Sequence, residues 1–152
     1  MTMQDLPLGF TEKVTFQLRS LYNRHGYSRY KMNKFEEYDL YARNKDFLIS
    51  DSVITFTDNG GKLMALKPDV TLSIVKNTAG TEALQKLYYN ENVYRVSKGS
   101  GAFREMMQVG LECLGDVDDY CLTEVILLAA RSLLAISEDA VLDISHLGLV
   151  KE

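Results

Sequence analysis

The sequence predicts an α+β domain in which helices cover an antiparallel sheet, and three observations lead to this fold class. The tetrapeptide Asp58-Asn59-Gly60-Gly61 separates two short β-prone runs and predicts a hairpin, because Asn and Gly tolerate the positive φ angles of such turns. Apolar residues recur at helical spacing near both ends of the chain. Strand-like and helix-like segments are mixed between them.

The first expected element is an amphipathic helix over residues 10–24, where apolar residues follow a spacing close to 3.6. Gly26 stands where a helix is expected to stop. The segment 27–32 is short and rich in tyrosine, and it is predicted to form a strand. The charged and aromatic residues 35–46 are expected to form a partly exposed helix or loop.

The middle of the chain supplies the sheet. Residues 53–57 and 62–66 are the strands of the predicted hairpin, and residues 70–76 are expected to be helical. Asp69 near the start of that helix and Lys76 near its end suit the helix dipole. Two further strands are predicted over residues 84–96 and 103–114, joined by a flexible connector at 98–101.

A second long helix is expected to start at Asp118 or Asp119 and to run to about Ile136. Its middle, residues 125–130, is nearly all apolar, which predicts that it is well buried. Residues 141–144 are predicted to be a last strand. Because the sequence stops just beyond it, we expect these residues to be a fragment of a longer domain.

Composition limits the class of protein. A length of 152 residues is enough for one domain with a hydrophobic core, and the net charge of −4 argues mildly against a domain that grips phosphate backbones. Cys113 and Cys121 lie in apolar surroundings without metal-ligand spacing, so we expect reduced thiols. The sequence has neither a membrane-spanning apolar run nor a signal-peptide pattern, which predicts a soluble cytoplasmic protein.

Residues 103–114 form the most informative strand, because the two faces differ. At a spacing of two, one face is apolar apart from Glu105, and a strand that packs this face in the core would explain the pattern. A binding site is the alternative, because Gly110 leaves clearance between Gln108 and Glu112, whose amide and carboxylate could bind an ammonium group and a polar neighbour. The opposite face carries Arg104, Met106, Gln108, Gly110 and Glu112.

Two other segments offer charged side chains. If the backbone is extended after Pro68, Asp69 and Thr71 point the same way and present a carboxylate and a hydroxyl; the alternative is an ordinary helix start. Arg95 ends a β-prone run, and its guanidinium could hold a carboxylate or phosphate by two hydrogen bonds. A surface or salt-bridging role would equally explain this arginine.

Residues 87–115, LYYNENVYRVSKGSGAFREMMQVGLECLG, resemble motif 2 of the class II aminoacyl-tRNA synthetases, specifically the histidyl type: strand, arginine, loop, arginine, strand. MALKPDVT at residues 64–71 is similar to that family's arginine-proline-acid-x-threonine element, which contacts the amino acid. Residues 10–30 resemble the motif 1 helix and strand of the dimer interface, without the usual proline. The resemblance covers nearly the whole chain. It implies that residues 1–152 are the N-terminal part of a class II synthetase-like catalytic-core domain, with an incomplete antiparallel sheet flanked by helices.

The resemblance also assigns expected roles to individual residues. Lys67 replaces the usual arginine of its element, which leaves the role of this position open. His146 lies in a segment similar to the glycine-histidine element of the regulatory branch, where packing or capping is favoured, and His25 is expected to have only a dipole-favourable place at a helix end. The matched positions around the histidine substrate are Asp69, Thr71, Gln108 and Glu112, and Arg95 and Arg104 match the motif 2 arginine and the arginine after its loop.

Three features favour the regulatory branch of the family, the regulatory subunits of ATP phosphoribosyltransferase. LPLGF at residues 6–10 together with LKPDVT, and LDISHLGLVKE at residues 142–152, resemble that branch. The enzymes have a glutamate two residues after the motif 2 arginine that helps recognise the adenine of ATP, and here this position is Ser97. Losing one charged hydrogen bond costs about 1.5–3 kcal/mol, or roughly a ten- to hundredfold loss of affinity. Motif 3 and the second histidine-binding element are not found in these residues.

The resemblance therefore implies a non-catalytic subunit in histidine biosynthesis. It would be needed for the activity of a short-form ATP phosphoribosyltransferase catalytic subunit and for its feedback inhibition by histidine. Expected partners are that catalytic subunit, histidine and a second copy bound through the motif 1-like region; no cofactor, metal, membrane or tRNA is expected. The alternatives are a fragment of a histidyl-tRNA synthetase, and a synthetase-like interaction domain with an empty pocket.

Overall fold

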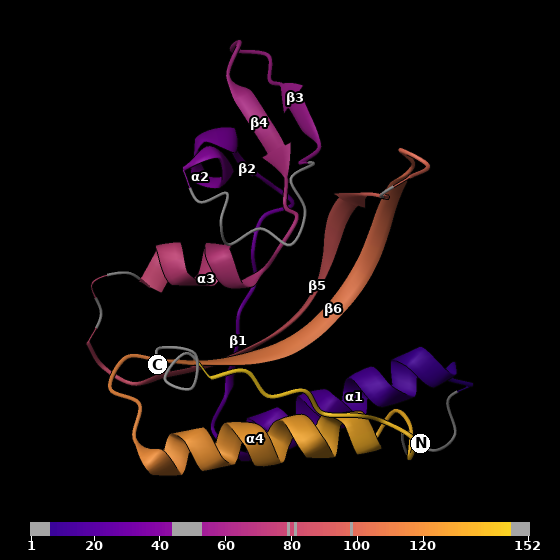
Figure 1. The fold of residues 1–152 in the computed structure, drawn as a ribbon, viewed down its shortest axis with the longest axis vertical. Helices are drawn as coiled ribbons and strands as arrows, with labels where there is room; N and C mark the ends of the chain where they lie inside the picture. The colour runs from indigo at the N-terminus through magenta and orange to yellow at the C-terminus, as the bar shows by residue number, and fades with distance from the viewer. Residues whose placement is uncertain (1–6, 44–52, 79, 81, 98, 147–152) are drawn as a thin grey trace. The chain divides into compact units, whose positions relative to one another are not determined.

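The computed structural model describes residues 7–43, 53–78, 80, 82–97 and 99–146 (Figure 1). The chain divides into two compact units, one made of Met1–Gly26 with Val117–Glu152 and the other of Tyr27–Asp116. The first unit holds two long helices, and the second holds all the described strands with two shorter helices. This mixture of helices with largely antiparallel strands confirms the predicted α+β class.

The two long helices are α1 (Phe10–Arg24) and α4 (Asp119–Leu134). The bounds of α1 are those predicted from its apolar spacing. Asp118 caps α4, because its side chain accepts a hydrogen bond of 2.8 Å from the backbone N–H of Cys121. Tyr22 joins the helices through a hydrogen bond of 2.8 Å between its hydroxyl and that of Ser132. Among the described residues no helix is both long and apolar enough to cross a membrane.

Two predictions for this unit are wrong. The apolar middle of α4 is not uniformly buried: Leu128 is fully buried, but Ile126 and Leu127 are 37% and 44% exposed. Only one side of α4 can pack against α1, so an all-round apolar sequence leaves part of its surface in solvent. Residues 141–144 form no strand, and Val141 and Ile144 are exposed. A β-prone sequence becomes a strand only where a neighbouring strand accepts its hydrogen bonds.

The larger sheet of the second unit contains β1 (Ser28–Arg29), β5 (Gln85–Val96) and β6 (Phe103–Leu114), in the order β1-β5-β6. β5 and β6 pair antiparallel along their whole length, and these are the two long curved strands of Figure 1. β1 pairs parallel with β5 and contains only two residues of the strand predicted over 27–32. Both long strands were predicted within one residue of their bounds.

The smaller sheet has the order β2-β4-β3, with both pairs antiparallel. It contains the predicted hairpin, formed by β3 (Thr55–Thr57) and β4 (Leu63–Leu66). β2 (Phe35–Glu37) is followed at once by the short helix α2 (Tyr38–Ala42), so the expectation of a single helix or loop over 35–46 missed a strand. Residues 44–46 of that prediction lie outside the described part of the chain.

Helix α3 (Thr71–Thr78) covers the β5–β6 sheet and so decides which face of the two strands is packed. Val70 and Ile74 form a fully buried cluster with Val93 of β5. Partly buried hydrophobic residues complete this core, namely Tyr30, Met32, Leu87, Tyr89, Met106 and Leu114. The candidate residues on β5 and β6 that share a face with Val93 and Met106 therefore lie on the side that α3 covers.

Two glycines provide a matched test of the backbone. Gly61 in the hairpin turn has φ +82° with open space where a Cβ would stand, whereas Gly115, just after β6, has φ +93° and a Cβ there would lie 2.5 Å from the carbonyl oxygen of Ala83. We expect Gly61→Ala to lower the free energy of unfolding by about 1–2 kcal/mol, the cost of the left-handed conformation. Gly115→Ala should cost more, because backbone cannot move aside as a side chain can. Urea denaturation of both variants measures the difference, and equal losses would contradict this reasoning.

Candidate functional site

The register of β5 and β6 places the polar candidates on one face, with each residue of β6 directly opposite a residue of β5. Met106 of this face joins the core beneath α3, whereas Phe103 and Met107 of the other face are 74% and 46% exposed. The interpretation of a strand with its apolar face in the core and a plain solvent face opposite is therefore wrong for this half of β6. The opposed pairs on the packed face are Glu112 with Leu87, Gly110 with Tyr89, Gln108 with Glu91, Met106 with Val93, and Arg104 with Arg95.

Asp69 and Thr71 belong to the start of α3, so the backbone follows the helix-start alternative. Asp69 Oδ1 accepts a hydrogen bond of 3.2 Å from the backbone N–H of Leu72. The Thr71 hydroxyl nevertheless reaches the sheet, where it donates a hydrogen bond of 2.6 Å to Glu112 Oε1. The two segments that the sequence singled out separately thus meet at one place.

Glu112 has the most informative electrostatic environment of these residues. Burial raises the pKa of its carboxyl above the ordinary value, and the nearby Asp69 carboxylate raises this pKa further. The Thr71 hydrogen bond acts in the opposite direction, because it stabilises the charged form. A bound cation would offset both unfavourable causes, so this place on the sheet favours a positively charged ligand group.

We expect substitutions at the two neighbours to move the pKa of Glu112 in opposite directions. Thr71→Val removes the hydrogen bond to the carboxylate and should raise this pKa further, whereas Asp69→Asn removes a negative charge and should lower it. The raised pKa also makes the stability of the fold depend on pH. A carboxyl whose pKa is raised on folding stabilises the native state fully below its unfolded pKa of about 4.3. This stabilisation is lost as the pH rises through the folded pKa. Carbon-13 NMR titration of the Glu112 carboxyl measures the shifts, and movement in the same direction for both variants would contradict the assignment.

Arg95 links β5 to the segment before α3. Its Nε donates a hydrogen bond of 2.9 Å to the carbonyl oxygen of Pro68, and its Nη2 lies 3.9 Å from Asp69 Oδ2. Nη2 is buried and has no hydrogen-bond partner within the described part of the chain. Arg104, directly opposite on β6, is exposed. Like charges opposite one another destabilise a sheet, so this pair suits a carboxylate or phosphate that could bind between or beside the two guanidinium groups.

Lys67 and Glu91 form a pair that the sequence reasoning missed. Lys67 is 1% exposed, and its Nζ lies 2.5 Å from Glu91 Oε2. The backbone fixes Lys67 on both sides, because its N–H donates to the carbonyl oxygen of Lys34 and its own carbonyl oxygen accepts from the N–H of Tyr94. A spacing of two along β5 places Glu91 on the same face as Arg95, and the register with β6 adds Gln108 to that face.

Gly110 does not provide the ligand clearance that the sequence suggested. The Tyr89 ring crosses from β5 and occupies the space above this glycine, so that an added Cβ would lie 2.5 Å from Tyr89 Cζ. Because glycine has no side chain, the phenol of Tyr89 fits above Gly110 and lies between Gln108 and Glu112 on the packed face.

A second carboxylate holds α3 from the other side. Glu36 of β2 accepts hydrogen bonds of 2.6 Å from the hydroxyls of Ser73 and Tyr41. Burial raises the pKa of Tyr41, and the charges of Glu36 and Asp69 raise it further, so the phenol stays protonated and donates. This network ties β2, α2 and α3 together and thereby supports the helix that carries Thr71.

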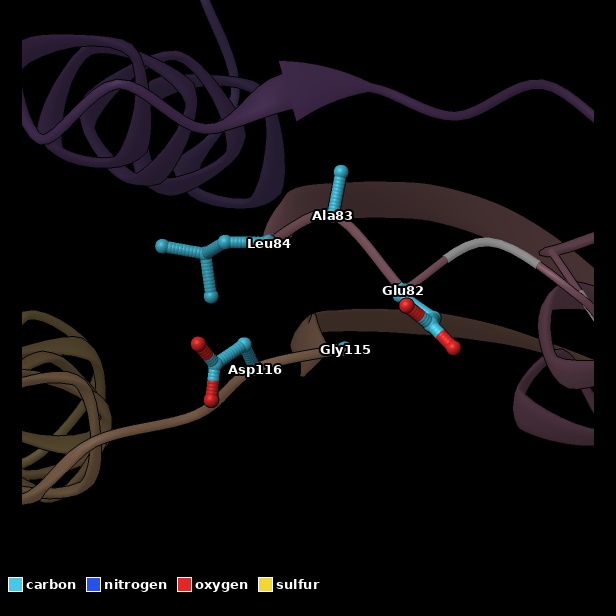
Figure 2. A pocket seen from close by; sticks show the side chains of 5 residues that line it. All are labelled: Glu82, Ala83, Leu84, Gly115 and Asp116. Atoms are coloured by element: carbon cyan, nitrogen blue, oxygen red, sulfur yellow. The ribbon is translucent and has the colours of Figure 1, made fainter.

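The remaining candidates lie elsewhere. His25 and His146 belong to the unit of the two long helices, where His25 Nδ1 lies 3.4 Å from Glu124 Oε1 and His146 is exposed. Across the described ranges, histidine, cysteine and acidic side chains do not gather in groups of three or more that could hold a metal ion. Figure 2 shows a shallow hollow at the start of β5 and the end of β6, lined by Glu82, Ala83, Leu84, Gly115 and Asp116 and by none of the candidate residues.

Comparison with known proteins places the chain in a family. The family model described as histidyl-tRNA synthetase matches residues 9–152. The histidine–tRNA ligase of Methanocaldococcus jannaschii is 34% identical over 91% of this chain and 34% of its own length. The ATP phosphoribosyltransferase regulatory subunit of Oceanobacillus iheyensis is 30% identical over 96% of this chain and 37% of its own length.

A solved structure described as an ATP phosphoribosyltransferase regulatory subunit/histidyl-tRNA synthetase from Bacillus halodurans shares the fold. Its TM-score is 0.71 at 24% identity, over 90% of this chain and 39% of that one. This likeness agrees with the predicted class II synthetase-like sheet. The chain spans about a third of the length of the curated relatives it matches. With the family model covering nearly all of its residues, the chain belongs to the histidyl-tRNA synthetase family.

Proposed function

We propose that this chain is the N-terminal part of the catalytic-core-like domain of an ATP phosphoribosyltransferase regulatory subunit, and that it performs no catalysis itself. In this role it would act in the cytoplasm, pair with a second copy through the motif 1-like region around α1, and bind a short-form catalytic subunit. Histidine bound to the regulatory subunit would inhibit that partner. The observation that carries the proposal over a synthetase function is Ser97.

Ser97 directly follows β5, two residues after Arg95. Its N–H donates a hydrogen bond of 2.8 Å to the carbonyl oxygen of Ala102, and its carbonyl oxygen accepts one of 3.1 Å from the N–H of Gly101. The backbone is therefore committed to the turn between β5 and β6. A short neutral hydroxyl stands where the synthetases have the glutamate that helps recognise adenine, so the site lacks an acceptor that ATP activation uses.

The histidine site is proposed on the face beneath α3. Asp69 and Glu112 supply negative charge for an ammonium or imidazole group, and Gln108 on the same face supplies an amide. Arg95, with its buried Nη2, and Arg104 offer positive charge for the carboxylate. Histidine can regulate a partner only if it binds one state of the assembly more tightly than another.

The test is the activity of a short-form catalytic subunit with and without this chain, while histidine is titrated. Stimulation that histidine reverses is the expected result. A parallel assay with a version extended to the length of the relatives separates two failures: stimulation by the longer version alone locates the missing contacts beyond Glu152. No stimulation by either version overturns the regulatory proposal.

A fragment of a histidyl-tRNA synthetase is the second candidate. The observation that favours it is the ligase from Methanocaldococcus jannaschii, which is more similar in sequence than the regulatory subunit from Oceanobacillus iheyensis. Histidine-dependent ATP–pyrophosphate exchange by the full-length gene product would establish this alternative and displace the first. Failure of that product to bind either histidine or ATP would instead indicate an interaction domain with an empty pocket.

A further inference from the structure

Glu91 is a polar residue on the packed face of the sheet that neither the motifs nor the family resemblance marks. It stands directly opposite Gln108. Along the packed face, the opposed arginines Arg95 and Arg104 lie on one side of this pair, and Gly110 and Glu112 lie on the other. Its side chain is 16% exposed, so it is largely enclosed but not sealed. Its neighbours on the same face of β5, Tyr89 and Val93, pack in the core beneath α3.

Lys67 fixes the position of this carboxylate. Glu91 Oε2 accepts a hydrogen bond from Lys67 Nζ, and within the described part of the chain no hydrogen bond engages Oε1. Lys67 itself is 1% exposed, so its ammonium can hold Glu91 but offers little surface to a ligand. The lysine backbone is bound to Lys34 and Tyr94, and the side chain is 1% exposed, so burial leaves the ammonium little space in which to move away.

Stability alone does not explain this arrangement. A buried ion pair contributes little more than well-packed apolar residues of similar size, because both charges must lose their hydration. The loss of hydration is useful where the fixed charge binds a ligand, since a preorganised group loses little entropy when the ligand arrives.

We propose that Glu91 is a specificity-determining residue of this site, whose carboxylate, held by Lys67, contacts the ammonium group of an amino-acid ligand. An ammonium group has three donors, and Glu91, Gln108 and Asp69 supply three acceptors on or beside one face of the sheet. This inference rests on the proposed histidine site and adds a contact to it. It accounts for an enclosed carboxylate beside Gln108 that the family positions leave without a role.

The test compares two ligands that differ only in the ammonium group, histidine and imidazole-4-propionate, by isothermal titration calorimetry on the full-length protein. Lys67→Gln combined with Glu91→Gln keeps a neutral hydrogen-bonded pair and removes both charges together. We expect this double variant to bind histidine roughly ten- to hundredfold more weakly and to bind imidazole-4-propionate as the parent protein does. The exposed pair Lys62 and Glu37, 2.6 Å apart, provides the matched control, in which both substitutions to Gln should leave both affinities unchanged.

The charge exchange Lys67→Glu with Glu91→Lys is the second variant, because it keeps an ion pair but places an ammonium on the sheet face. It should abolish the preference for histidine over imidazole-4-propionate. Equal weakening of both ligands in the neutral double variant would show a structural role and overturn the inference, as would an unchanged preference. Failure of the parent full-length protein to bind histidine would overturn this inference and the proposed histidine site together. An ammonium preference without regulation of the catalytic subunit would overturn the proposed function alone.

Discussion

Lys67→Met is expected to lower the free energy of unfolding by about 3–5 kcal/mol, because it removes one partner of a buried ion pair and leaves the other without compensation. Lys67 is 1% exposed and Glu91 only 16%, so little water can replace the lost ammonium. Methionine fills a similar volume without charge. The loss therefore reports the stranded carboxylate rather than a cavity.

Urea denaturation followed by circular dichroism measures this effect. Lys62→Met is the matched control, because Lys62 is 55% exposed and its pair with Glu37 lies in solvent, where screening leaves exposed ion pairs nearly without effect on stability. Replacing both members, Lys67→Met with Glu91→Leu, should recover most of the lost stability. A single variant as stable as the control would mean that Glu91 is adequately solvated and that the pair is not needed for the fold.

The elements predicted correctly are those whose signal is local. The bounds of α1 follow from apolar spacing and a terminal glycine, and the β3–β4 hairpin follows from its turn residues. In that turn Asp58 Oδ1 accepts hydrogen bonds from the N–H groups of Gly60 and Lys62, so the sequence of the turn contains its own hydrogen-bond partners. β5 and β6 were found for a similar reason, because Gly99 and Gly101, which have positive φ angles, mark the turn between them.

The errors occur where structure depends on a distant partner. Residues 141–144 have strand composition but form no strand. The apolar middle of α4 has, among the described residues of its own unit, one other helix to pack against. The space above Gly110 was assigned to a ligand because the sequence of β6 alone does not show that Tyr89 stands opposite. The register between strands decided that question.

The candidate site likewise contains residues that the sequence could select and one, Glu91, that it could not. The resemblance selected Asp69, Thr71, Gln108 and Glu112, and the structure brings Thr71 and Glu112 into direct contact and places Gln108 on the same face. Whether these four bind histidine stays a prediction. Glu91 could not be selected from the motifs, because its importance arises from a lysine 24 residues earlier in the chain.

Asp69→Ala and Glu112→Ala are each expected to weaken histidine binding about ten- to hundredfold while the protein stays folded. Each substitution removes a carboxylate that could accept a charged hydrogen bond, worth about 1.5–3 kcal/mol, and this free energy corresponds to the stated loss of affinity. Burial and the Asp69 charge destabilise the charged form of the Glu112 carboxyl. A cation bound there should offset this destabilisation and so gain binding free energy.

Calorimetric titration of histidine into the full-length protein measures both affinities, and circular dichroism checks the fold. Glu105→Ala is the matched control, because Glu105 lies on the same strand but points from the opposite face, where it accepts hydrogen bonds from Asn92 and Tyr94. Its affinity should equal that of the parent protein. If Asp69→Ala and Glu112→Ala also bind histidine as the parent does, the inherited site does not hold the effector, and histidine must regulate through a different surface.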